Sequence, residues 1–255
     1  MARAFDGKAS SLVFLLRNLY MHLLAMVMLF LAPFPSFAAT SDRYHIHGFS
    51  KDGKIFVMEV FGESDAILGG HATYYFVDVH KDAFLKGTPI SHRAGEGADE
   101  DLRTIRAKAG QAADARLRAI GGLLPGEVLA SQTRMQDKNL ANSLVFKTPY
   151  LYSYPGTGRR TNFIELSAFD AQATGNNFFN EQCRGYILMA NDVVVHEDMA
   201  QLPKGRGCPI DYFVREVVMN RETNDMVVII EHLTTGTEGK DRNFLIQPAG
   251  KAFDE

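Results

Sequence analysis

The segment YFVREVVM-NRETND-MVVIIEH, residues 212–232, contains two strand-like runs joined by a short polar segment. Both runs are rich in valine, isoleucine and aromatic residues, which favour β-strands. The polar residues between them, at positions 220–224, are typical of a hairpin loop. The segment therefore predicts a β-hairpin, and it indicates a fold built mainly from antiparallel sheet.

More strands are predicted on the N-terminal side of this hairpin. Residues 44–49 and 55–61 form a second candidate hairpin, because Asp52-Gly53 between them suits a tight turn. Residues 73–79 read as the next strand. The other candidate strands are residues 143–147, 162–169, 185–190, 193–196 and 243–246.

One long helix is predicted between about residues 99 and 120. Apolar residues recur there at spacings of three and four, which places them on one face. Gly121-Gly122 offers a C-terminal cap. The apolar face consists of Leu102, Ile105, Ala109, Ala112, Ala113, Leu117 and Ile120. The sequence thus predicts an α+β fold, in which this helix packs on a mainly antiparallel sheet.

The first 38 residues have the order of a secretory signal peptide. A basic lead is followed by the apolar run 19–32, and small residues close the segment at Ser36 and Ala38. We expect cleavage after Ala38, with cleavage one residue later or retention as a membrane anchor as alternatives. The 14-residue run is short for a spanning helix, which needs about 20 apolar residues. We expect residues 39–255 to form a single exported domain, periplasmic or secreted.

The composition of this exported part argues against two classes of partner. The leader carries three basic residues and one acidic, so 24 of the 27 Lys and Arg and 29 of the 30 Asp and Glu remain. A mildly acidic chain without a dense basic patch does not favour nucleic acid. No second long apolar run follows the leader, so no membrane span is expected after cleavage.

Cys183 and Cys208 are the two cysteines of the chain. In an oxidising exported compartment, an isolated pair favours a disulfide. Two thiols at this spacing form neither a C-x-x-C redox motif nor a four-ligand metal site. We therefore predict a structural disulfide between them.

Histidines supply the main metal candidates, because Asp52 and Asp78, which could suggest calcium, lack the alternating oxygen ligands of an EF-hand. His45 and His47 are two positions apart and share a face of their predicted strand, while His71 and His80 flank the strand at 73–79. Imidazoles bind zinc and copper. No spacing fixes a further ligand, so a solvent-facing pair is the alternative. We expect no metal and no other cofactor, with His45 and His47 as weak candidates.

A charged segment lies between the last two predicted strands. Glu238-Gly239-Lys240-Asp241-Arg242 is predicted to be a loop that could bind an ion. The alternative is a turn with local ion pairs, each worth less than about 1 kcal/mol. Glu238, Asp241 and Arg242 form the candidate functional surface.

Signatures of common enzymes are missing from the sequence. It contains no G-x-S-x-G, H-E-x-x-H or C-x-x-C motif. His196-Glu197-Asp198 is interpreted as a polar turn after a strand. No catalytic residue is assigned, and whether the protein is an enzyme is left open, with a lean towards no.

Several of these features together resemble known proteins. Residues 48–56 with 74–79 look like one hairpin of a TolB-type propeller blade, so an irregular partial propeller is the alternative architecture. The same hairpin, the helix, Arg206–Pro209 with Tyr212, and residues 236–242 are similar to an uncharacterised family of predicted secreted bacterial proteins (domain of unknown function 2259). The resemblance implies export and a single domain, and it assigns no catalytic residue.

Two hypotheses for function remain at this point. The first is an exported bacterial protein with a non-enzymatic binding or envelope-associated role, whose partner would be an envelope protein or a cell-wall component. The second is a hydrolase or metal-dependent enzyme, with a site assembled from distant residues. His45, His47, Glu238 and Asp241 would be its first candidates.

Overall fold

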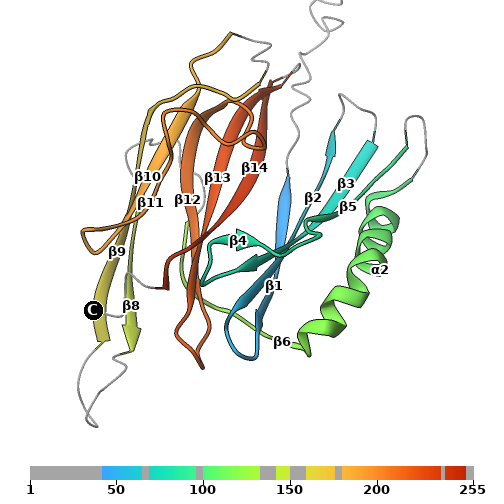
Figure 1. The fold of residues 1–255 in the computed structure, drawn as a ribbon, viewed down its shortest axis with the longest axis horizontal. Coiled ribbons are helices and arrows are strands. Elements are labelled where there is room, and N and C mark those ends of the chain that lie inside the picture. The colour runs from blue at the N-terminus through green and yellow to red at the C-terminus, as the bar shows by residue number, and fades with distance from the viewer. Residues whose placement is uncertain are drawn as a thin grey trace, which may run out of the picture. The chain divides into compact units, whose positions relative to one another are not determined.

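The computed structural model describes residues 42–64, 69–95, 100–132, 142–149, 159–175, 180–236 and 239–250. Within these ranges the named strands form three sheets, and every pairing between them is antiparallel. Figure 1 shows the sheets side by side, with helix α2 (Leu102–Ile120) against one of them. The predicted α+β class is confirmed.

The helix-side sheet contains the N-terminal strands. Its order is β4-β3-β2-β1-β6, and β5 also pairs with β3. Its strands are β1 (Arg43–Ser50), β2 (Ile55–Ser64), β3 (Gly69–Asp78), β4 (Ala83–Phe84), β5 (Ile90–Arg93) and β6 (Leu123–Leu124).

The other two sheets follow later in the chain. The middle sheet has the order β14-β13-β12-β7, and the outer sheet has the order β11-β10-β9-β8. The middle sheet consists of β7 (Glu127–Ser131), β12 (Pro209–Met219), β13 (Met226–Gly236) and β14 (Gly239–Pro248). The outer sheet consists of β8 (Ser143–Pro149), β9 (Arg159–Asp170), β10 (Arg184–Ala190) and β11 (Val193–Glu197).

The middle sheet is covered on both faces. Val228 and Ile230 of β13 pack in one cluster with residues of the outer sheet, such as Leu188. Val227 and Ile229 point the other way and pack with Phe56 of the helix-side sheet. Side chains of a strand alternate between the two faces of its sheet, so an unbroken apolar run is what a doubly covered strand requires. The predicted hairpin 212–232 thus lies in the sheet between the other two sheets.

Helix α2 covers the remaining face of the helix-side sheet. Ile105, Ala109 and Ala113 are fully buried against that sheet. The Asp101 side chain accepts a hydrogen bond from the backbone N–H of Thr104, so the helix begins at residue 102, not 99. Gly121 ends it with a left-handed backbone, φ 79°.

The predicted strands are all present, and most are longer than predicted. Four short strands, β4 to β7, were not predicted. Ala112, placed by its spacing on the apolar face of the helix, is exposed. Stacked open sheets give no support to the propeller alternative.

Cys183 and Cys208 form the predicted disulfide, with an S–S distance of 2.06 Å. Cys183 is buried beside Ala171 and Leu202. The bond joins the segment before β10 to the segment before β12, and it therefore ties the outer sheet to the middle sheet.

The predicted signal peptide, residues 1–38, lies outside the described residues. In the part of the chain that is described, no helix has both the length and the apolar character needed to cross a membrane.

Candidate functional site

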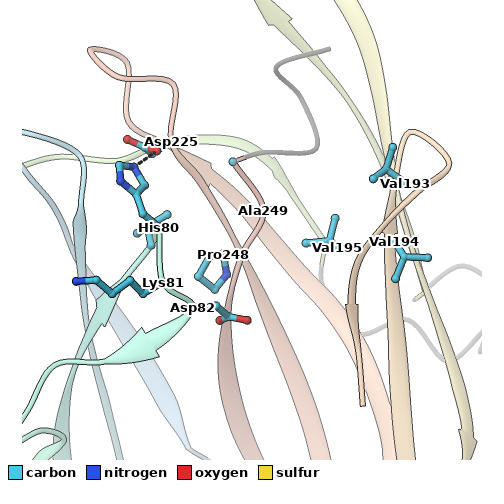
Figure 2. Close-up of a pocket in the computed structure, with 11 residues that line it drawn as sticks. His80, Lys81, Asp82, Val193, Val194, Val195, Asp225, Pro248 and Ala249 are labelled. Atoms are coloured by element: carbon cyan, nitrogen blue, oxygen red, sulfur yellow. Dashed lines mark hydrogen bonds and ion pairs between the residues drawn. The ribbon is translucent and has the colours of Figure 1, made fainter. Parts of the chain in front are cut away.

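A cleft of about 660 Å³ opens where residues from all three sheets meet. Figure 2 shows that His80, Lys81 and Asp82 lie on one side and that β11 forms the other side. The end of β14 lies between them. This inter-sheet cleft is lined by Val79, His80, Lys81, Asp82, Val193, Val194, Val195, Asp225, Pro248, Ala249 and Gly250.

The charged side of the cleft is largely paired. His80 Nε2 lies 2.8 Å from Asp225 Oδ1, and Lys81 Nζ lies 2.8 Å from Asp78 Oδ2. Asp82 is half exposed and holds a left-handed backbone, φ 49°. The turn between β3 and β4 therefore places paired polar side chains along this side of the cleft.

The opposite side of the cleft is apolar. Val193 and Val194 are 44% and 54% exposed, and they lie on β11 at the edge of the outer sheet. Exposed valines on an edge strand form a surface that a ligand or partner can cover.

A buried ionic cluster lies next to the Asp82 side of the cleft. Its centre is Asp198, whose side chain is 2% exposed. The Asp198 carboxylate accepts hydrogen bonds from the backbone N–H of Tyr186, at 3.1 Å, and from Arg206 Nη1, at 3.0 Å. It also lies 3.1 Å from His196 Nε2. We call Asp82, Tyr186, His196, Asp198, Arg206 and Gln247 the Asp198 cluster.

His196 lies between two carboxylates. Its Nε2 faces Asp198, and its Nδ1 lies 3.9 Å from Asp82 Oδ2. Burial alone would lower the pKa of His196, but the two carboxylates outweigh burial and raise this pKa to about 9. The imidazole stacks on the Tyr186 ring, with centroids 4.8 Å apart. At neutral pH His196 is therefore protonated, and its positive charge is stabilised by the two carboxylates.

Gln247 connects this cluster to the middle sheet. Its Nε2 donates to Asp82 Oδ2 at 2.9 Å, and its Oε1 accepts from the Tyr186 hydroxyl at 2.9 Å. Burial raises the pKa of Tyr186, so this hydroxyl keeps its proton and remains a donor. The cluster fixes the position of Asp82 at the side of the cleft.

The interpretation of His196-Glu197-Asp198 as a polar turn was wrong. Val193–Glu197 is strand β11, and Asp198 directly after it is the centre of a buried cluster. The partners Asp82 and Arg206 lie 116 and 8 positions away in the sequence, so no local pattern reveals them. The one available signal was the H-x-D spacing at a strand end, which places both side chains on one face.

The predicted charged surface has a different structure. Glu238 lies outside the described residues. Asp241 and Arg242 belong to β14 instead of a loop, and neither lines the inter-sheet cleft. Arg242 Nε lies 3.2 Å from Oε1 of Glu231, a fully buried residue, and Arg215 Nε lies 3.4 Å from its Oε2. Arg242 thus contacts a buried carboxyl group of the middle sheet.

His45 and His47 do share one face of β1, and their ring centroids lie 4.8 Å apart. His71 and His80 do not join them, because His71 lies 3.2 Å from Asp42 and His80 pairs with Asp225. Among the described residues, no three His, Cys, Asp or Glu side chains form a group suited to a metal ion.

The comparisons identify the family. The family model for "Predicted secreted protein (DUF2259)" matches residues 57–249, which is most of the chain. The chain belongs to this family of predicted secreted proteins. A comparison with curated proteins and one with solved structures each gave no significant match. The DUF2259 match covers all of the inter-sheet cleft except Gly250, and the Asp198 cluster entirely.

Proposed function

We propose that this DUF2259 protein is exported by a cleavable signal in residues 1–38 and acts as a non-enzymatic binding protein of the bacterial envelope. Its ligand occupies the inter-sheet cleft. The observation that carries this proposal is the contrast between the two sides of the cleft, with exposed valines on β11 across from the turn that carries His80, Lys81 and Asp82.

The charged side chains of this turn suit binding because they are positioned before a ligand arrives. Asp82 is held by a hydrogen bond from Gln247 and lies 3.9 Å from His196, and Lys81 pairs with Asp78. A preorganised site loses less conformational entropy when its ligand binds. An envelope protein or a cell-wall component with an apolar patch beside polar groups matches both sides of the cleft.

A hydrolase or metal-dependent enzyme is the alternative function, and the chemistry of the cluster favours it less. A general base in hydrolysis needs a neutral imidazole near the working pH. With a pKa of about 9, His196 is mainly protonated at neutral pH and holds its proton between two carboxylates. A protonated His196 suits recognition of a ligand better than it suits proton transfer in a reaction.

The test compares two valine variants of the outer sheet. Val194→Asp puts a charge on the apolar side of the cleft, and Val145→Asp puts the same charge on β8, at the opposite edge of that sheet. Both valines are exposed, 54% and 68%, so neither change disturbs the core. Binding of the purified protein to isolated cell walls and to solubilised envelope proteins is measured.

We expect the wild type and Val145→Asp to bind alike, and Val194→Asp to bind at least tenfold more weakly. Equal binding by all three proteins would refute the cleft as the binding site. Turnover of ester, peptide, phosphate or glycoside substrates that is lost in His196→Gln would support the enzyme instead. N-terminal sequencing of exported protein tests the signal, and we expect a chain that starts at Ala39.

A further inference from the structure

A second cavity, of about 540 Å³, lies between β1 and the first turns of α2. We call it the basic pocket. Because β1 alternates, Arg43, His45 and His47 face the helix, while Tyr44 and Ile46 pack towards the middle sheet. The basic pocket is lined by Arg43, His45, His47, Glu59, Phe61, Tyr74, Leu102, Arg103, Arg106 and Ala107.

The charges lining this pocket do not balance. They comprise three arginines and one carboxylate, that of Glu59. Arg106 already forms a bidentate salt bridge with this carboxylate. Its Nε lies 2.9 Å from Oε1, and its Nη2 lies 2.7 Å from Oε2. Burial alone would raise the pKa of Glu59, but Arg106 and His47 outweigh burial and hold this pKa at about 2.

Arg43 and Arg103 therefore add two positive charges that the pocket does not neutralise. Within the described residues, neither guanidinium forms an ion pair with a carboxylate. Both side chains are exposed at the pocket, and Arg43 lies over the Phe61 ring at 5.6 Å. A chain with an overall formal charge of −3 thus carries a local cationic cavity.

The two imidazoles add donors to the same cavity. His47 is stacked on Tyr74, with ring centroids 5.0 Å apart, and its edge meets His45. His47 Nε2 is buried and has no hydrogen-bond partner among the described residues, since Glu59 Oε2 is 3.9 Å away. The His45 ring is exposed at the pocket, so it is the imidazole that a bound acceptor can reach directly.

We propose that the basic pocket binds an oxyanion, the phosphate, sulfate or carboxylate group of a small ligand, between Arg43, Arg103 and the imidazoles of His45 and His47. Guanidinium groups match the geometry of such oxyanions and bind them through paired hydrogen bonds. Glu59 and Arg106 also line this site, but they pair with each other, so we do not assign them to the anion. The site is separate from the inter-sheet cleft, so each proposal can fail alone.

Binding at this site should strengthen as the pH falls. Burial and the neighbouring His47 lower the pKa of His45, so this ring is neutral at pH 7.5 and gains charge only in acid. The groups that face it are His47 and Arg43 from β1, Glu59 from β2, Tyr74 from β3, and Arg103 and Arg106 from α2. A bound anion favours the protonated form of His45, and by linkage protonation of His45 favours the anion.

The experiment measures binding of sulfate, inorganic phosphate and citrate to the exported full chain by calorimetry, at pH 5.5 and 7.5. Sulfate keeps a constant charge over this range, so its pH dependence reports the protein alone. The variants are Arg43→Gln and Arg103→Gln, with Arg118→Gln as the control. Arg118 lies in the last turn of the same helix, is 74% exposed, and pairs with Asp114.

We expect saturable binding of at least one anion, at least tenfold weaker in Arg43→Gln and in Arg103→Gln and unchanged in Arg118→Gln. Sulfate should bind several-fold more tightly at pH 5.5 than at pH 7.5. The ring NMR signals of His45 and His47 should shift as sulfate is added. A preference for citrate over phosphate would assign a carboxylate ligand, and the reverse a phosphate ligand. Absence of saturable binding by all three anions, or equal weakening in Arg118→Gln, would overturn the proposal.

Discussion

At the scale of single residues, Asp198 is the centre of the buried cluster, because it contacts Tyr186, His196 and Arg206. It is almost fully buried and yet ionised, because His196, Arg206 and the N–H of Tyr186 all favour the carboxylate over the acid. Burying an ion is costly unless it is paired and hydrogen-bonded. The ionised Asp198 therefore depends on the positive charges of His196 and Arg206.

His196 makes the stability of the protein depend on pH. Its pKa is about 9 in the folded chain and about 6.5 unfolded, so the folded state holds the extra proton between these values. By linkage, this stabilisation is complete below pH 6.5 and is lost as the pH rises through 9. We expect a loss of about 1–2 kcal/mol, since solvent screens this partly exposed site.

Urea unfolding at pH 6.5, 7.5 and 9 tests this expectation. His196→Gln should reduce the fall in unfolding free energy between pH 6.5 and 9, while Val194→Ala on the same strand should not, since it removes no titrating group. An unchanged slope in His196→Gln would contradict the assignment. The series stays at or above pH 6.5 because burial lowers the pKa of His232 to about 3, which destabilises the folded chain in acid.

At the scale of elements, α2 depends on small residues. Ala109 and Ala113 are fully buried against the helix-side sheet, and each contributes only a methyl group to this interface. Gly110 is similarly confined, because an added Cβ would lie 3.3 Å from the Tyr74 hydroxyl. The helix can come this close to the sheet only while these positions stay small.

Ala109→Leu should lower the unfolding free energy by about 1–3 kcal/mol, because the larger side chain overfills a packed interface. Ala112→Leu is the matched control, since Ala112 is exposed on the same helix and should change stability by less than about 0.5 kcal/mol. Thermal or urea unfolding followed by circular dichroism measures both. Equal effects of the two substitutions would place the buried face of the helix elsewhere.

The elements show which local signals are reliable. The hairpin at 212–232 and the helix were predictable because period and composition agree in both. β5 and β7 were not predicted because they contain no fully buried residue and few strand-forming residues, as in ISHR at 90–93. Their strand structure comes from pairing with β3 and β12, which is tertiary information.

At the scale of the whole molecule, the candidate sites follow from the stacking of layers. The inter-sheet cleft combines the turn after β3, strand β11 and the end of β14, which no sequence spacing relates. The two histidines of β1 were identifiable from their spacing, but Arg103 and Arg106 of the same pocket come from α2, about 60 positions later. Sequence could therefore predict single side chains of a site but not the cavity that joins them.

The stacking also implies that the layers unfold together. Val227 and Val228 are adjacent, fully buried and on opposite faces of β13, one towards the helix-side sheet and one towards the outer sheet. Val227→Ala and Val228→Ala should each lower the unfolding free energy by about 2–3 kcal/mol through lost burial and a residual cavity. Val145→Ala, at a 68% exposed position, is the control.

Hydrogen exchange then separates a shared core from independent layers. If the middle sheet couples both sides, each variant should speed amide exchange in α2 and in β9 alike, because opening one interface opens the other. If Val228→Ala sped exchange in β9 alone and left α2 protected, the outer sheet would unfold by itself. The disulfide between Cys183 and Cys208 bridges the outer and middle sheets and is present in both variants. Any difference in exchange between the two variants therefore comes from packing.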